Sequence, residues 1–174
     1  MSYSYPFSSQ EKGSGDELSI IPPLFAADVM LGRTARWLRM LGFDTYYDNR
    51  AGDDDLKRLS LKENRVLLTK DVALHQAMPA GSSRLVEAVH PRQQLEEIAA
   101  VFRLEKFTLP PRCSLCNGEL ATIDKELARD LVPPYVFRTQ SSFQRCSQCQ
   151  KIYWPGTHLS KIDQYIKNIR KASG

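Results

Sequence analysis

The stretch VLLTKD, residues 66–71, is an apolar run that ends abruptly at an acid. Its first residues do not alternate between apolar and polar side chains, which is typical of a central parallel strand buried on both faces. The carboxyl ends of parallel strands share one edge of a sheet, and ligands bind at that edge. Asp71 therefore predicts a functional site if other strands of the chain end in the same way.

Three other segments have the composition of strands in the same sheet. IIPPLFAAD (20–28) predicts a strand that ends at Asp28. FDTYY (43–47) predicts a second strand, and the loop after it contains the acids 53–55. RLVEAV (84–89) predicts a further strand after VLLT. At least three carboxylates are therefore expected at one edge.

Amphipathic segments alternate with these strands. The first, LGRTARWLRMLG (31–42), has helical spacing, and Gly42 is placed to end it in the left-handed conformation. A second helix is expected over about 56–63, capped by the preceding acids. A short third helix is expected around 71–78, and a fourth begins at Pro91. This order predicts an α/β fold, a three-layer sandwich on a mostly parallel sheet.

The strand-end acids have two interpretations. Like charges within about 4–6 Å raise one another's pKa unless a cation compensates them, and Mg²⁺ or Mn²⁺ prefers carboxylate oxygens. Asp28, Asp71 and the acids 53–55 then form a divalent-metal site suited to phosphodiester hydrolysis. Alternatively, each acid is an ordinary helix N-cap, because Asp is among the best residues for that position.

Four cysteines form two pairs with two residues inside each pair. Such pairs hold tetrahedral Zn²⁺, and four thiolates close the coordination sphere, so the ion is expected to be structural. A long insertion separates the pairs. The expected zinc ligands are Cys113, Cys116, Cys146 and Cys149.

Basic residues predict contact with a polyanion. The chain carries a net charge of +4, and Arg33, Arg36 and Arg39 recur along the first predicted helix, where guanidinium groups match phosphate oxygens. The alternative is a solvated helix face. Near the cysteines, basic and aromatic residues either bind RNA or pack over a module too small for its own core; they are Arg112, Arg138, Arg145, Lys151, Phe143, Tyr153 and Trp154.

The chain divides into four predicted parts. Residues 1–20 are rich in Ser and Gly and are expected to be a disordered tail. The α/β core follows over 21–106, the zinc ribbon over 107–157 and a helix over 158–174. No stretch reaches the roughly 20 apolar residues of a membrane span, and the leader lacks the apolar core of a signal peptide, so a soluble cytoplasmic protein without a membrane partner is expected.

Five motifs occur in a fixed order: DVMLGRTARWLRMLGFDT (28–45), DDDL (53–56), NRVLLTKD (64–71), RCSLCNG (112–118) and CSQCQKIYWPGTH (146–158). Together they resemble the Mut-seven C-terminal RNase family, a PIN-like nuclease domain that carries a zinc ribbon. The three histidines of the chain carry no usable pattern and are not expected to be catalytic.

The resemblance implies a PIN-like fold and metal-dependent cleavage of RNA. It assigns Asp28 and Asp71 to the family's acidic positions and the middle acid to Asp53 or Asp54. Lys70, where the family more often has Arg, keeps a positive charge for RNA beside the acids.

We therefore expect a metal-dependent ribonuclease with a structural zinc, a catalytic Mg²⁺ or Mn²⁺, and RNA as its partner. The main alternative is a non-catalytic RNA-binding or adaptor module, in which the acids only cap helices. A phosphatase for small molecules is a weaker alternative. The oligomeric state is not predicted.

Overall fold

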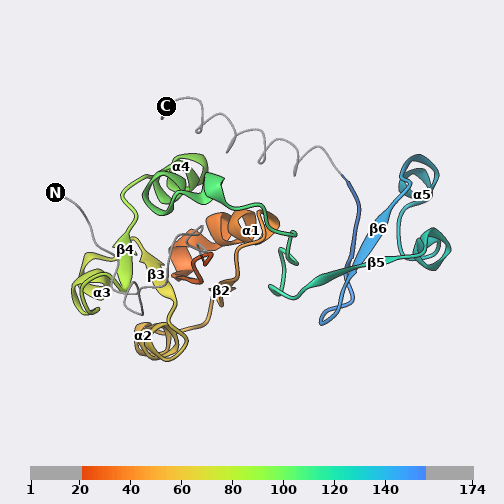
Figure 1. Ribbon diagram of the computed structural model, residues 1–174. Helices are drawn as coiled ribbons and strands as arrows, with labels where there is room; N and C mark the ends of the chain where they lie inside the picture. Colours follow the sequence, from red (N-terminus) through yellow and green to blue (C-terminus); the bar gives the residue numbers. More distant parts are fainter. Residues whose placement is uncertain (1–20, 156–174) are drawn as a thin grey trace, which may run out of the picture.

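Four short parallel strands form the centre of the N-terminal part of the molecule (Figure 1). The computed structural model describes residues 21–155, so the predicted tail and the predicted C-terminal helix lie outside the described residues. The strands lie in the order β2-β1-β3-β4, and each neighbouring pair is parallel. Their bounds are β1 Phe25–Ala27, β2 Thr45–Tyr47, β3 Val66–Thr69 and β4 Ser83–Leu85.

Helices cover both faces of this sheet. A 3₁₀ turn, η1 (Val29–Leu31), leads into α1 (Gly32–Met40), which packs on one face beside α4 (Pro91–Phe102). The other face carries α2 (Asp53–Lys62) and α3 (Val72–Gln76). A second 3₁₀ turn, η2, ends this part at residues Leu104–Lys106. The α/β fold with a parallel sheet is therefore confirmed.

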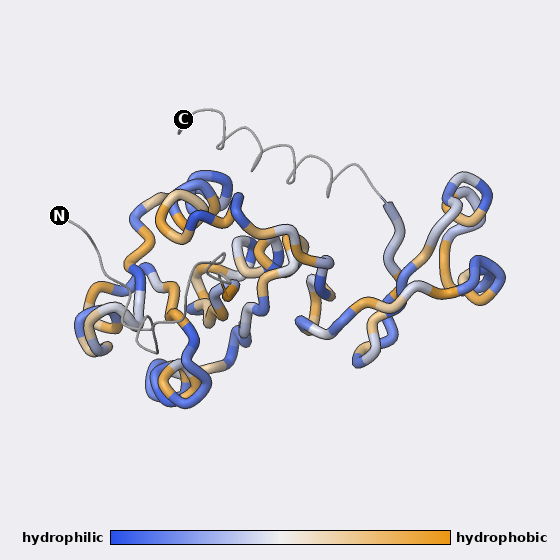
Figure 2. Tube along the Cα trace, viewed as in Figure 1, coloured by the Kyte–Doolittle hydropathy of each residue, from blue (hydrophilic) through white to orange (hydrophobic). Residues whose placement is uncertain are grey.

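Alternating side chains build a separate hydrophobic core on each face of the sheet. Phe25 and Leu68 point into the core under α1 and α4, whereas Ala26 and Leu67 point into the core over α2 and α3. All four residues of β3 are buried, which confirms a strand covered on both faces. Figure 2 shows hydrophobic residues through the middle of this part and hydrophilic residues on the outer turns of the helices.

Some element boundaries differ from the predictions. Gly42 does end α1 with a positive φ of 94°, but α2 begins at Asp53 with Gly52 as its N-cap, rather than at residue 56. The acids fit inside the first turn because the amino end of a helix favours negative charge. The fourth strand stops at Leu85, since the backbone N–H groups of residues 87 and 88 donate to Glu97 of α4 instead of continuing a strand.

A second sheet of three antiparallel strands holds the C-terminal described part. The strands are β5 (Leu120–Ile123), β6 (Phe143–Cys146) and β7 (Ile152–Tyr153). The insertion predicted between the cysteine pairs contains a 3₁₀ turn, η3 (Lys125–Ala128), and α5 (Pro134–Thr139). A small core joins the insertion to the sheet and consists of Ala128, Val132, Phe143 and Ile152.

Within residues 21–155, no helix has both the length and the apolar character needed to cross a membrane.

Candidate functional site

Asp28 and Asp71 both lie at the carboxyl edge of the four-stranded sheet. Asp28 directly follows β1 and is only 5% exposed, whereas Asp71 follows β3 and is exposed. The buried hydroxyl of Thr69 connects them. It donates to Asp28 Oδ2 over 2.8 Å and accepts from the backbone N–H of Asp71 over 2.9 Å. The two acids are therefore held in a fixed relation by one side chain.

The buried carboxylate of Asp28 neither caps a helix nor forms an ion pair with another described residue. Its side chain makes no capping hydrogen bond to η1, and none of the ion pairs within residues 21–155 includes it. A buried carboxylate is costly unless a cation or several hydrogen bonds stabilise it. The hydroxyl of Thr69 supplies one neutral hydrogen bond. This environment favours a cation beside Asp28.

Asp71 is an N-cap, as the alternative interpretation predicted. Its Oδ1 accepts from the backbone N–H of Leu74 over 2.9 Å at the start of α3. An ionised carboxylate has two oxygens and about four acceptor positions. Capping through Oδ1 is therefore compatible with a metal contact through Oδ2.

The three acids 53–55 differ in their partners. Asp54 Oδ1 lies 2.7 Å from Lys57 Nζ, and this hydrogen bond lowers the pKa of the Asp54 carboxyl. Asp55 pairs with Arg58. Asp53 is exposed in the first turn of α2 and belongs to none of the ion pairs formed by the described residues. Of the three carboxylates, Asp53 is therefore the one left available to a ligand.

Two further acids lie at this edge that our sequence interpretation did not select. Ala27 is paired with Tyr47, so Asp48 follows β2 at the level at which Asp28 follows β1. Leu85 is paired with Thr69 at the end of β4, and Glu87 lies in the loop that follows. The sequence signal for Asp48 was present, because TYYD ends in an acid as FAAD does. The predicted strand over residues 84–89 includes Glu87, whereas β4 ends at Leu85 and leaves Glu87 in the loop.

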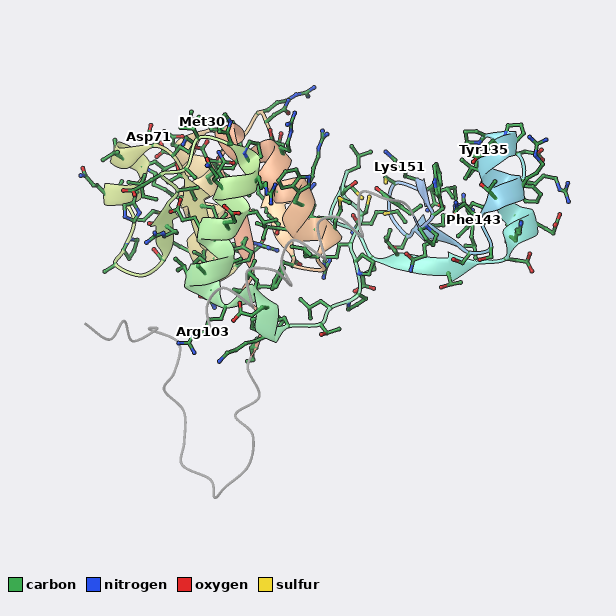
Figure 3. The ribbon with its side chains drawn as sticks, turned by 90° about the horizontal axis from the view of Figure 1, so that it is seen from above. Met30, Asp71, Arg103, Tyr135, Phe143 and Lys151 are labelled. Carbon is green, nitrogen blue, oxygen red and sulfur yellow. The ribbon has the colours of Figure 1, made fainter. Side chains whose placement is uncertain are left out.

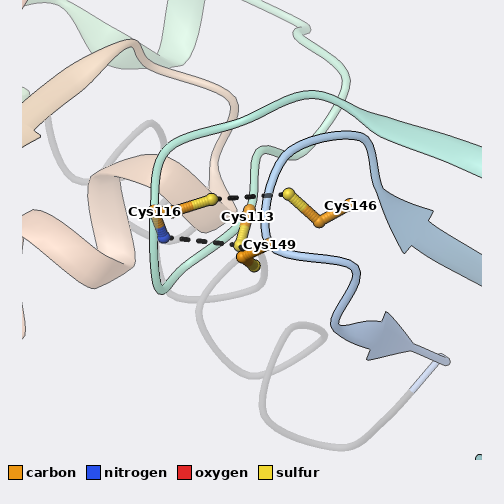
Figure 4. Close-up of side chains that lie close together, drawn as sticks. All are labelled: Cys113, Cys116, Cys146 and Cys149. Atoms are coloured by element: carbon orange, nitrogen blue, oxygen red, sulfur yellow. Dashed lines mark hydrogen bonds between the residues drawn. The ribbon is translucent and has the colours of Figure 1, made fainter.

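The four cysteines converge on one point in the ribbon (Figure 4). Their sulfur atoms all lie within 4.8 Å of one another. The Sγ–Sγ distance is 3.5 Å for Cys113 and Cys149 and 3.4 Å for Cys116 and Cys146. Tetrahedral Zn²⁺ with Zn–S bonds of about 2.3 Å places its sulfur ligands about 3.8 Å apart. All four thiols are free of disulfides, so the donor set and spacing fit Zn²⁺.

Among residues 21–155, the cysteines are the one group of three or more His, Cys, Asp or Glu ligand atoms gathered this closely. The acids of the sheet edge lie farther apart. A metal ion bound by them would need substrate oxygens or water as its remaining ligands.

The pKa values of the cysteines are consistent with a site that a cation would complete. Burial raises the pKa of Cys113, but hydrogen bonds from Tyr153 and nearby backbone N–H groups lower it to about 6. Burial and the neighbouring thiols raise the pKa of Cys116 to about 12. Thiolates cannot all ionise at close range without a compensating charge, and a bound metal supplies that charge.

Each cysteine pair forms a tight backbone turn, here called a knuckle. Asn117 and Gln150 follow the second cysteine of each pair, and their φ values are +70° and +63°. Gly118 is also required, because a Cβ at this position would lie 2.9 Å from Cys146 Sγ. The sequence therefore shapes the loops so that paired thiols face one another.

The family model of the Mut7-C RNAse domain matches residues 23–166, which is most of the chain. The chain belongs to the Mut7-C RNAse domain family. Comparison with curated proteins and with solved structures gave no significant match. Family membership confirms the resemblance seen in the sequence motifs and indicates a nuclease-type function on RNA.

In this Mut7-C domain, the predicted RNA-binding arginines do not share one environment. Arg33 and Arg36 are exposed on α1, so RNA contact stays a prediction for both. Arg39 is only 3% exposed. Its Nε donates to the Thr45 carbonyl over 2.8 Å, and Nη1 donates to the Leu115 carbonyl over 2.9 Å. Backbone carbonyls of β2 and the first knuckle use its donors, which supports a structural role for Arg39, and RNA contact stays a prediction for this residue.

Arg39→Met is expected to lower the free energy of unfolding by about 2–4 kcal/mol, because several carbonyl oxygens lose a charged donor in a buried place. Arg36→Met is the matched control on the same helix. Its side chain is exposed, so the cost should stay within about 0.5 kcal/mol. Urea denaturation of both variants measures the difference, and equal losses would show that Arg39 has no special structural role.

Like Arg39, Asp44 connects the four-stranded sheet to the first knuckle. It accepts from Arg65 Nη1 over 2.6 Å and from Asn117 Nδ2 over 2.8 Å, and Arg112 lies 3.5 Å away. Burial alone would raise the pKa of Asp44, but these partners hold it below its ordinary value. Thr45 N–H also donates to Asn117 Oδ1 over 3.1 Å. The first knuckle is therefore fixed to the start of β2.

Lys70, the remaining predicted RNA contact, has partners within the protein. Its Nζ donates to the carbonyls of Ala88 over 2.7 Å, Glu87 over 3.3 Å and Val86 over 3.5 Å. These carbonyls belong to the loop after β4. Lys70 thus holds this loop against the end of β3.

Proposed function

We propose that this protein is a metal-dependent ribonuclease with a PIN-like fold that hydrolyses RNA phosphodiester bonds at the carboxyl edge of its four-stranded sheet. Membership of the Mut7-C RNAse domain family supports action on RNA. The observation that carries the metal dependence is Asp28, a buried carboxylate without a capping role or an ion pair among the described residues, held by Thr69.

Asp28, Asp71 and Asp53 would hold Mg²⁺ or Mn²⁺, with Asp54 as the alternative middle acid. Carboxylate oxygens fit these ions, which keep several waters and take substrate phosphate as a further ligand. When bound, the ion activates water and stabilises the leaving oxygen. Thr69 orients Asp28, and exposed Arg33 and Arg36 bind phosphates of the RNA backbone.

The ribbon contributes in a different way. Four thiolates leave no open position on Zn²⁺, so this ion is structural. Exposed Arg138, Arg145 and Lys151 give the ribbon a basic surface for RNA. Phe143 is fully buried in the small core, which supports packing for this ring, whereas Trp154 is partly exposed and available to stack on a base.

Cleavage of a labelled, structured RNA pool by the purified protein should occur with Mn²⁺ or Mg²⁺ and stop with EDTA. EDTA can also remove zinc, so the zinc content of the EDTA-treated protein is measured as a control. Protein with an unchanged zinc content should recover activity when Mn²⁺ is added back. Cleavage at full rate in EDTA, or no cleavage with either ion, would refute the proposal.

A non-catalytic RNA-binding module is the second candidate, and the capping bond of Asp71 favours it. It requires that RNA affinity falls with salt and is unchanged by Mg²⁺ or by substitution of the acids. RNA that is bound but never cut would support this candidate.

A further inference from the structure

Four large apolar side chains are exposed at the same edge as the acids, and we call them the apolar rim. Val29 and Met30, directly after Asp28, are 44% and 61% exposed. Val72, directly after Asp71, is 52% exposed, and Val89, in the loop after β4, is 74% exposed. Figure 3 shows Met30 and Asp71 at the same edge of the core, away from the ribbon.

Contacts from β2 hold the first half of the rim. The hydroxyl of Tyr47 donates to the Val29 carbonyl over 3.3 Å. The same ring packs against Gly32, where a Cβ would lie 2.4 Å from the Tyr47 hydroxyl oxygen. Gly32 thus lets Tyr47 lie under the turn that carries Val29 and Met30. This turn is fixed in place although its apolar side chains face solvent.

Buried polar groups hold the second half. Thr34, one turn after Met30, donates to Gln94 Oε1 over 2.6 Å. Gln94 Nε2 in turn donates to the carbonyls of Val89 over 3.1 Å and Ala88 over 3.2 Å. Lys70 holds the same Ala88 carbonyl from the side of β3. A continuous set of hydrogen bonds therefore joins α1, α4, the loop after β4 and the residue before Asp71.

This arrangement gives the rim the properties of a binding surface. Exposed apolar side chains that gather beside polar residues mark interaction sites more often than scattered single residues do. A surface that is already ordered loses little entropy when it binds. Val29 and Val72 directly follow two of the proposed metal-binding acids in the chain, and exposed Arg33 comes one helical turn after Met30. A ligand with a phosphate at the acids therefore has its neighbouring groups at the rim.

We propose that the apolar rim contacts the bases of unpaired nucleotides next to the cleaved phosphodiester, so that the protein selects unpaired RNA over duplex RNA. This inference rests on the proposed ribonuclease function. An unpaired base presents an apolar face that aliphatic side chains can cover. In an A-form duplex the bases are stacked and paired, and proteins reach mainly the backbone and the minor groove.

The test measures RNA binding separately from cleavage. Full-length protein is titrated with a fluorescent unpaired oligoribonucleotide and with the same sequence in a duplex, in Ca²⁺, an oxygen-binding cation used here to replace the catalytic ion. The double variant Met30→Ser/Val89→Ser should bind the unpaired RNA about tenfold more weakly. Its affinity for the duplex should change less than twofold. Leu127→Ser, an equally exposed leucine on η3, is the control and should leave both affinities unchanged.

Each outcome decides between the two proposals. Selective loss of unpaired RNA supports the rim even if the protein does not cleave, which would refute only the ribonuclease proposal. Cleavage with unchanged affinities in the double variant overturns the rim and leaves the ribonuclease intact. The proposal for the rim is also overturned if the double variant loses affinity for both RNAs to the same extent, or if the wild-type protein binds neither RNA. The rim would then be a surface for a protein or for a second copy of this chain. Thermal melting of the double variant confirms that it is folded.

Discussion

Asp28→Asn is expected to reduce RNA cleavage by at least about a hundredfold. Removing a group that only supports a metal ligand usually costs 10–100-fold, so loss of the ligand itself should cost at least as much. Asn keeps the shape of the side chain and can still accept from Thr69, while it removes a buried negative charge. The Tm should therefore be equal or higher.

Two measurements separate this effect from misfolding. Mn²⁺ binding, followed by electron paramagnetic resonance, should weaken in Asp28→Asn together with cleavage. Asp130→Asn makes the same chemical change at an exposed residue of the insertion, and it should keep wild-type cleavage. Thr69→Val should give an intermediate loss that Thr69→Ser restores, because the hydroxyl is what positions Asp28. Wild-type activity and Mn²⁺ affinity in Asp28→Asn would exclude Asp28 as a ligand.

Cys116→Ser is expected to abolish zinc binding and to unfold the ribbon, while the parallel sheet stays folded but less stable. Structural zinc supplies folding free energy directly, and small zinc modules are unfolded without it. The ribbon has few other sources of folding free energy, because its own core contains only four buried residues. Purified wild-type protein should contain about one zinc per chain.

Hydrogen exchange shows where the stability is lost. Amides of β5 to β7 should lose protection in Cys116→Ser, and those of β2 should lose part of it, since Arg39 and Asn117 tie β2 to the knuckle. Amides of β3 should stay protected. Leu115→Ala is the control, because its side chain is exposed within the same knuckle. Full protection of the ribbon in zinc-free Cys116→Ser would show that the metal is not needed for folding.

Local patterns were sufficient to predict much of this fold. The unbroken apolar run of β3, the stop at Gly42 and the helix start at Pro91 each depend on neighbouring residues, and all three are confirmed. The cysteine spacing likewise predicted a cluster that the structure shows. Each of these features is determined by a few consecutive residues.

The environments of Arg39 and Lys70 were not predictable in that way. A spacing of three residues falls about 60° short of a full helical turn, so Arg39 is rotated by about 120° from Arg33. This rotation takes it from the exposed face towards the knuckle. Lys70 is held by carbonyls from a loop about sixteen residues later in the chain. Such contacts arise only when the sheet is assembled.

The junction at Asp44 also decides how this chain can be divided or recombined. A polypeptide cut after Lys106 would lose Arg112 and Asn117, two of the three partners of Asp44. It would also lose the knuckle carbonyls that accept from Arg39. The α/β part would then carry a charged group with missing acceptors at the end of its first helix. The ribbon is thus an integral part of the folded protein rather than a separable domain, and grafting it onto another protein would require moving Arg39 and Asp44 with it.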